Sequence, residues 1–457
     1  MREVLQVRSV HASLKDRRLM LTDGSLIPVQ VTASARRAGW GLSPVAREVF
    51  TYLAMDCRKP RLTLEINSEN AMMENAQTKP PRISIAVRAW NEEAVIRRTL
   101  ESLFQQSLFE ELSARGESCE VLCIPNGCTD RTAEIAAAVF AEKEKSHPFA
   151  NAFAASVRDM REAGRNHTWN AFVHGQSDPE AEFLFLMDSD ILFNRRETLF
   201  NMYRALLDNS EAQIASDQPI KDVSLKPTKS WRDRISLATS EMNGAIQGKM
   251  TGQLYCIRAE VARRLYLPKE LGIDDGFIKA IVCTDFFSNK LNAGRIVVAE
   301  DASHVYEAYT STGELLKNQK RQMIGQTIVH VLVEYLKTLP RKQRTNLADT
   351  LRRKEEASPE WVARLVGEHL QRVRYFWRLF PDAVSFRFKR WWRMRGVKRL
   401  THLPATLVGF AMTMLSCAQA HRHFKRGKMH FWPKAARENI RNLAADKPGL
   451  AQTIQTS

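Results

Sequence analysis

The 457-residue sequence contains few of the features of secreted, disulfide-stabilised proteins. It has seven cysteines and no CxxC pair, and its first 20 residues contain no apolar run. An odd number of scattered cysteines does not suit a disulfide framework, and Cys119, Cys123 and Cys128 lack the spacing of a zinc site. We therefore expect reduced thiols in a cytosolic protein that has no secretory signal.

Acidic residues and long apolar runs are scarce toward the C-terminal end. Residues 371–400 contain ten Lys or Arg and one Asp, which supply +9 of the net charge of +17. Phe and Trp are mixed with these charges, as in helices that lie on anionic lipid. The uncharged stretch 403–420 has 18 residues, which is short for a membrane span. We expect a protein peripheral to the inner face of the cell membrane. A single span at 403–420, an ordinary packed helical domain and nucleic-acid binding are lower-ranked alternatives.

The pattern of the sequence divides the chain into three regions, 1–78, 79–335 and 336–457. The first contains a predicted hairpin that turns at Asp23-Gly24 and a predicted short helix at 43–53. It ends in a polar, linker-like stretch, and we assign it no role. The third is the basic region, which we expect to be helical.

The middle region alternates short apolar segments with helical ones, which predicts a parallel α/β sheet. Strands are expected at 83–87, 120–124, 183–187 and 295–299. A helix capped by Asn91 should bury Ile96, Leu100, Leu103 and Phe104, and another should begin near Thr129 or Asp130. Ligands bind beyond the carboxyl ends of such strands, so the polar clusters at 89–92, 126–130 and 188–190 should converge on one crevice.

Two carboxylates, Asp188 and Asp190, end the third apolar strand. Neighbouring unpaired carboxylates are costly to bury, so a cation should meet them. Mg²⁺ and Mn²⁺ prefer oxygen ligands and bridge to substrate phosphates. The alternative is that Asp190 only caps the following helix.

Three segments in order, ISIAVRAWNEEAVIRRTLESL, EVLCIPNGCTDRTAEIA and FLFLMDSDI, resemble the family 2 glycosyltransferases with a GT-A fold over residues 82–330. The resemblance implies a Rossmann-like, mostly parallel sheet with flanking helices. It also implies that a sugar is moved from a nucleotide-diphosphate donor with inversion, assisted by Mn²⁺ or Mg²⁺. The chain departs from the family at Pro125, where an acidic residue is usual, and at Cys128, where Ser is usual.

The resemblance also implies site residues. Those that match donor-contacting positions are Ala89, Asn91, Glu92, Asn126, Asp130, Arg165, Asn170, Asp188, Gly252 and Arg321. Asp275 matches the catalytic base, with Asp274 as the alternative, although an acidic pair before glycine is also common in turns. The expected metal ligands are Asp188, Asp190 and His304. Gln322 stands where processive synthases have the Trp of a QxxRW segment, which favours transfer of a single sugar.

The leading hypothesis is an inverting glycosyltransferase that acts on a lipid-linked or envelope-glycan acceptor at the cytoplasmic membrane face. One rival is a sugar nucleotidyltransferase, which would need a glycine-rich loop directly after the first strand, where the chain has VRAWNEE. The other is a non-catalytic membrane- or nucleic-acid-binding protein with a degenerate transferase domain.

Overall fold

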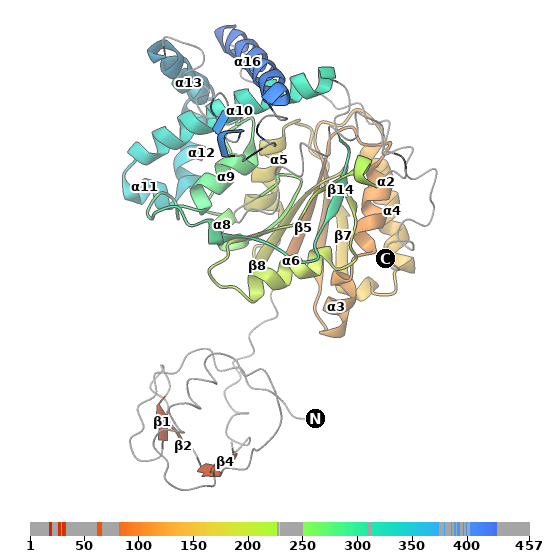
Figure 1. Ribbon diagram of the computed structural model, residues 1–457. Coiled ribbons are helices and arrows are strands. Elements are labelled where there is room, and N and C mark those ends of the chain that lie inside the picture. Colours follow the sequence, from red (N-terminus) through yellow and green to blue (C-terminus); the bar gives the residue numbers. More distant parts are fainter. Residues whose placement is uncertain are drawn as a thin grey trace. The chain divides into compact units, whose positions relative to one another are not determined.

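The computed structural model describes residues 82–225, 250–308, 312–373 and 403–426, four short strands before residue 66, residue 228 and a few residues between 379 and 399. The chain divides into two compact units, Met1–Lys79 and Pro80–Ser457 (Figure 1). In the first, β1 (Arg18–Met20) pairs antiparallel with β2 (Leu26–Pro28), as the predicted hairpin requires. Strands β3 (Gln30–Thr32) and β4 (Leu62–Glu65) form a second antiparallel pair. The predicted helix at 43–53 and the linker at 67–81 lie outside the described residues.

The second unit contains a seven-stranded sheet with the order β13-β10-β12-β8-β5-β6-β7. The strands are β5 (Arg82–Ala89), β6 (Cys119–Pro125), β7 (Phe153–Val157), β8 (Ala181–Asp188), β10 (Ile214–Ser216), β12 (Leu254–Arg258) and β13 (Ile296–Val298). Every pairing is parallel except those of β12, which runs antiparallel to both of its neighbours. The four predicted strands and the mostly parallel sheet are confirmed.

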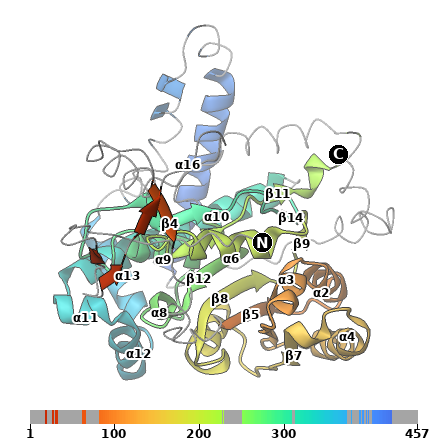
Figure 2. The same cartoon turned by 90° about the horizontal axis from the view of Figure 1, so that it is seen from below.

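Alternating side chains of the strands feed two cores, one on each face of the sheet. In β8, Phe183, Phe185 and Met187 join one cluster, while Leu184 and Leu186 join the other. The first is covered by α2 (Ile96–Phe104), α3 (Leu108–Ala114), α4 (Thr132–Ser146) and α6 (Thr198–Leu207). The second is covered by α5 (Arg165–Ala171), α8 (Ala259–Ala262) and α9 (Asp274–Val282). Figure 2 shows α2 and α4 on one side of the sheet and α8 and α9 on the other.

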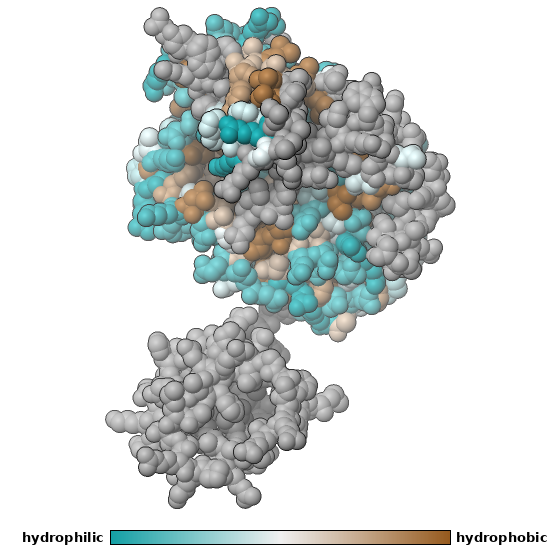
Figure 3. Space-filling model, viewed as in Figure 1, coloured by the Kyte–Doolittle hydropathy of each residue, from teal (hydrophilic) through white to brown (hydrophobic). Residues whose placement is uncertain are grey.

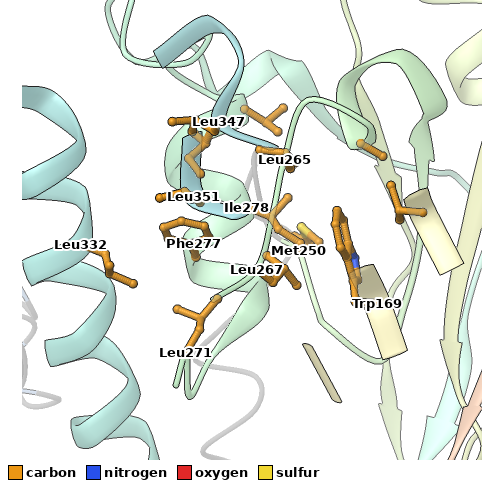
Figure 4. Packing of buried hydrophobic residues seen from close by; sticks show 14 of the residues in the cluster. Trp169, Met250, Leu265, Leu267, Leu271, Phe277, Ile278, Leu332, Leu347 and Leu351 are labelled. Carbon is orange, nitrogen blue, oxygen red and sulfur yellow. The ribbon is translucent and has the colours of Figure 1, made fainter. Parts of the chain in front are cut away.

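The second core continues into the C-terminal helices. Figure 4 shows Trp169 of α5, Phe277 of α9 and Leu332 of α10 among its members. The helices of this region are α10 (Thr312–Thr338), α11 (Arg341–Thr345), α12 (Leu347–Ala357), α13 (Trp361–Arg372) and α16 (Leu403–Lys425). The predicted helical character of the region is confirmed. No helix within the described residues is both long and apolar enough to cross a membrane.

Three details of the predicted local structure need correction. Helix α2 buries the four expected residues, but it begins at Ile96 and Asn91 does not cap it. Asn91 has a φ of 56° and accepts a hydrogen bond from the Thr129 backbone instead. Helix α4 begins at Thr132 rather than at Thr129 or Asp130. Asp190 is not a helix cap, because β9 (Leu192–Phe193) follows it and α6 begins only at Thr198.

The described cysteines are all free thiols, as expected. Cys119 and Cys123 lie in the core between the sheet and α2, where burial raises the pKa of both thiols. Core packing, not a zinc site, therefore accounts for these two cysteines.

Candidate active site

The cations that meet the strand-end carboxylate Asp188 are two arginines. Arg88 lies opposite Asp188 in the pairing of β5 with β8, and its Nη2 is 2.9 Å from Asp188 Oδ1. Arg165, the first residue of α5, places Nη1 2.9 Å from Oδ1 and 3.0 Å from Oδ2 of the same carboxylate. A guanidinium presents several N–H donors in a fixed plane. The two guanidinium groups can therefore bind one carboxylate from two sides.

The same two arginines hold Asp274, the first residue of α9. Arg165 Nε lies 3.1 Å and Arg88 Nη1 lies 3.3 Å from Asp274 Oδ2. Both arginines also donate to the carbonyl oxygen of Gly252, at 2.6 and 2.7 Å. The cluster at the ends of β5 and β8 thus contains two positive and two negative charges. Charged groups that are removed from water require such compensation.

Gly252 is needed at its position because the cluster surrounds it closely. A Cβ atom there would lie 2.9 Å from Asp274 Oδ1 and 3.0 Å from Arg165 Nη2. Gly252 is one of the residues that the resemblance predicts to contact the donor. In the structure the close neighbours are two side chains of the cluster.

The acidic pair at the start of α9 consists of two carboxyl groups in different environments. Burial raises the pKa of Asp274, but the Arg165 and Arg88 charges outweigh burial and lower it overall. Asp275 is half-buried, and burial together with the Asp274 charge raises the pKa of Asp275 to about 6. Its Oδ1 accepts a hydrogen bond of 2.7 Å from the Gly276 backbone. Adjacent carboxyl groups with opposite pKa shifts commonly have different roles in catalysis.

Asp190, the second carboxylate of the segment Asp188-Ser189-Asp190, has a raised pKa that a neighbouring cation would lower. Burial and the Asp188 charge raise the pKa of Asp190 to about 6, and a positive charge beside it would favour the ionised form. The Arg165 charge already acts on the Asp190 carboxyl in this direction.

His304, in β14 (His304–Tyr306), is fully buried and oriented by an acid. Its Nδ1 lies 2.6 Å from Asp217 Oδ2 and, because an ionised carboxylate only accepts, Nδ1 carries the proton. Nε2 of the neutral ring then keeps its lone pair, which is the form that binds metals. Gln253 Oε1 lies 3.4 Å from Nε2 and accepts only from a protonated Nε2, so metal binding by this atom requires the Gln253 amide to turn away.

Asp190 and His304 thus each have the chemistry of a divalent-cation ligand, whereas Asp188 is already held by two arginines. Across the part of the chain that the structure describes, no three His, Cys, Asp or Glu side chains form a metal-binding group. The expected set of Asp188, Asp190 and His304 is thus not assembled in this structure. The reason is that Asp188 directs its oxygens to Arg88 and Arg165.

The loops after β5 and β6 are bound to each other. Asn126 donates to the Ala89 carbonyl at 2.6 Å, and Asn91 accepts from the Thr129 backbone at 2.7 Å. Asp130 accepts from the Glu93 backbone at 3.1 Å and from Thr132 at the start of α4. The Glu92 backbone donates to the Thr132 hydroxyl at 2.7 Å. The predicted donor residues of both loops thus come together in one rigid unit, largely through contacts among themselves.

The remaining predicted residues lie in two places. Asn170 of α5 binds the backbone of Leu267 through both amide atoms, at 2.8 and 2.9 Å, so its role here is to hold that loop. Arg321 of α10 is half-buried, and its charge acts on the Asp275 carboxyl. Donor contact by either residue stays a prediction.

Sequence reasoning missed Arg88, Asp217 and Gln253. A charged residue inside the apolar segment ISIAVRA was the available indication for Arg88, because a buried arginine requires acidic partners. Asp217 directly follows β10, a strand too short to stand out in the sequence. Nothing in the sequence pattern distinguishes Gln253.

One comparison with known proteins identifies a family for part of this chain. Residues 84–259 match the family model described as glycosyl transferase family 2. The crystal structure of S. aureus TarS 1–349 is similar with a TM-score of 0.39 and 16% identity, and the match covers 76% of this chain and 92% of that chain. Glucosyl-3-phosphoglycerate synthase from Mycobacterium tuberculosis, crystallised with Mn²⁺ and UDP, has a TM-score of 0.35 and 15% identity over 57% of this chain and 81% of that chain. A search of curated proteins finds no match. The resemblance inferred from the sequence is thus confirmed as a match of residues 84–259 to the model of glycosyl transferase family 2.

Proposed function

We propose that this chain transfers a single sugar, with inversion, from a nucleotide-diphosphate donor to a hydroxyl of a lipid-linked or envelope-glycan acceptor at the cytoplasmic membrane face. The observation that carries the proposal is the difference between two adjacent carboxyl groups. Asp274 is held ionised by two arginines, and Asp275 beside it has a pKa raised to about 6. A carboxylate with such a pKa can accept a proton at neutral pH more effectively than an ordinary aspartate.

In this mechanism Asp275 Oδ takes the proton of the acceptor hydroxyl as its oxygen attacks the anomeric carbon. The bond from that carbon to the donor diphosphate breaks on the opposite face, which inverts the configuration. Asp274 takes no proton, because Arg88 and Arg165 stabilise its charge, and it keeps the pKa of Asp275 high. Arg321, whose charge acts on Asp275, would hold the leaving diphosphate.

Asp190 and His304 would hold Mn²⁺ or Mg²⁺. When bound, such an ion neutralises charge on the diphosphate. Asp217 fixes the imidazole of His304 in the required tautomer. The linked loops at 89–92 and 126–130 would contact the nucleotide of the donor.

A thermal-shift comparison of UDP- and GDP-sugars in the presence of Mn²⁺ tests the proposal at its first step. A donor should raise the melting temperature of the protein, and Asp275→Asn should retain that shift while it loses transfer. If no nucleotide sugar stabilises the protein, the proposed function is wrong. If Asp275→Asn transfers sugar normally, the catalytic base is assigned to the wrong residue.

A further inference from the structure

Helix α16 has an unusual distribution of side chains. Along most of its length the inward face is lined by small and polar residues, including Thr413, Ser416 and Ala420, which are at most 6% exposed, and its last turn buries the ring of Phe424. Ser416 on this face donates a hydrogen bond of 3.2 Å to Gln319 of α10. The outward face presents Leu407 and Leu415, each 50% exposed. A surface helix of a soluble protein normally has the opposite arrangement, with its large apolar residues inward.

Exposed aromatic residues extend this apolar face. Phe388 packs against Phe410 of α16 with ring centroids 4.9 Å apart, and it is 36% exposed. Trp392, one helical turn further along the chain, is 68% exposed. Figure 3 shows hydrophobic residues gathered at the end of the molecule where Figure 1 draws α16. We call Phe388, Trp392, Leu407 and Leu415 the α16 outer face.

The charges around the α16 outer face have one sign. No Asp or Glu occurs from residue 383 to residue 437. Lys389 and Arg393 are exposed beside the aromatic residues, and Arg422 and Lys425 are exposed at the end of α16. Apolar side chains between exposed cations match a bilayer surface that offers acyl chains below anionic headgroups. A second copy of the chain would bring like charges together, and nucleic acid would leave the two leucines in water.

We propose that the α16 outer face docks on the surface of a bilayer that contains anionic lipid. Helix α16 lies parallel to that surface with Leu407 and Leu415 inserted, and the neighbouring cations contact headgroup phosphates. Trp392 suits the headgroup level, where an amphipathic ring is preferred.

Docking through the α16 outer face would also place the membrane on the side of the protein from which α10 leads to the proposed base, Asp275. Helix α10 contacts α16 through Gln319, and six residues later Gly325 packs against Gly272 and Ile273, directly before Asp274. One helix therefore separates the α16 outer face from the acidic pair. A membrane-borne acceptor would reach Asp275 from the docked side. This last step rests on the sugar transfer in the proposed function, whereas the docking does not depend on that transfer.

Flotation of the full-length protein with vesicles tests the docking without any donor or acceptor. The protein should float with phosphatidylglycerol–phosphatidylcholine vesicles and much less with pure phosphatidylcholine. The double variant Leu407→Ser/Leu415→Ser should lower the partition coefficient at least ~10-fold, because both side chains lose apolar contact. The matched control is Leu291→Ser, which removes a 69% exposed leucine elsewhere in the fold and should float normally.

The charge contribution is tested in the same assay. Lys389→Gln/Arg393→Gln should weaken binding by about fivefold for each charge removed, and Lys290→Gln should not. Raising the salt to about 0.5 M should weaken binding of the unaltered protein. Asp275→Asn should float like the unaltered protein, so that a failed transferase assay and a failed docking assay are distinguishable.

Three results would overturn the docking proposal. The first is an unaltered protein that does not float with anionic vesicles. The second is a loss that is equal in Leu291→Ser and in the double leucine variant. The third is a Leu407→Ser/Leu415→Ser variant that floats normally but no longer forms the dimers, or binds the RNA, of the unaltered protein. That result would assign the α16 outer face to another partner.

Discussion

Arg88 and Asp188 lie opposite each other in the paired strands β5 and β8, and their side chains form an ion pair of 2.9 Å. The Arg88 side chain is 3% exposed, so its charge depends on Asp188 and Asp274 for compensation. Burial of this kind makes the arginine a positioning residue. It holds the carboxylate of Asp188, at the end of β8, and the carboxylate of Asp274, at the start of α9, in fixed positions.

Removal of the Arg88 guanidinium should therefore be strongly destabilising. Arg88→Met should lower the free energy of unfolding by about 3–5 kcal/mol, because it leaves buried carboxylates with one cation fewer. The control is Arg97→Met, whose ion pairs with Glu101 and Glu142 are exposed and worth less than about 1 kcal/mol. Urea unfolding measures both. Equal losses in the two variants would contradict the structural role given to Arg88.

Substitution of the two adjacent aspartates should have different consequences. Asp275→Asn keeps the shape of the site but cannot accept a proton, so kcat should fall ~10²–10⁴-fold while donor affinity is retained. Its stability at pH 8 should not fall, because the substitution removes the cost of burying a carboxylate whose pKa is raised. Asp274→Asn should instead reduce stability, since Arg88 and Arg165 each lose a partner. Donor binding measured beside turnover separates the two, and a dead Asp274→Asn enzyme beside an active Asp275→Asn enzyme would exchange the assigned roles.

The pH dependence of turnover follows from the same pair. A base must be deprotonated to act, so activity should fall as the pH decreases through about 6, the pKa to which burial and Asp274 raise Asp275. With an ordinary aspartate as the base, this loss of activity on the acid side of the pH profile would occur near pH ~4. Asp274→Asn removes the neighbouring negative charge, so any residual activity should show an acid limb at lower pH. A limb that stays in place in this variant would mean that another group sets it.

The effect of the metal ion on donor binding should require Asp190. Asp190→Asn should abolish the increase in donor affinity that Mn²⁺ produces, because one of the two residues that fit the cation is lost. The fold should remain intact, and stability at pH 8 should not decrease, since burial raises the pKa of the Asp190 carboxyl. Asp208→Asn is the control, because this side chain is 70% exposed. Calorimetric titration with UDP, with and without Mn²⁺, provides the measurement, and a normal Mn²⁺ effect in Asp190→Asn would exclude this ligand.

The contact between α10 and the start of α9 should tolerate no added methyl group. A Cβ atom at Gly325 would lie 2.5 Å from Ile273 Cδ1 and 3.1 Å from Ile273 Cβ, directly before the acidic pair. Gly325→Ala should lower stability by about 1–3 kcal/mol and reduce kcat, because Ile273 or α10 must move. Gly367→Ala in α13 meets no atom within 4 Å and should stabilise by up to about 1 kcal/mol, as alanine does in helices. Thermal unfolding of the two variants checks the difference in sign.

Local sequence patterns determined much of this protein. The apolar segments of β5, β6 and β8 predicted buried parallel strands, because strands covered on both faces are apolar at nearly every position. The polar residues that follow them indicated one edge of the sheet as the site. The ordered motifs indicated the family, and the spacing of Ile96, Leu100, Leu103 and Phe104 predicted the buried face of α2.

Only the tertiary structure decided which charges meet. Arg88, Arg165, Asp188 and Asp274 come from four separate elements, and no periodicity or spacing relates them. The cations that lie beside Asp188 in this structure are the two arginines, Arg88 and Arg165. Asparagine is a residue type that commonly caps helices, but the side chain of Asn91 accepts a hydrogen bond from the Thr129 backbone of the neighbouring loop instead. Capping and ion pairing depend on which groups lie within about 3 Å in space, and the packing of the sheet sets those distances.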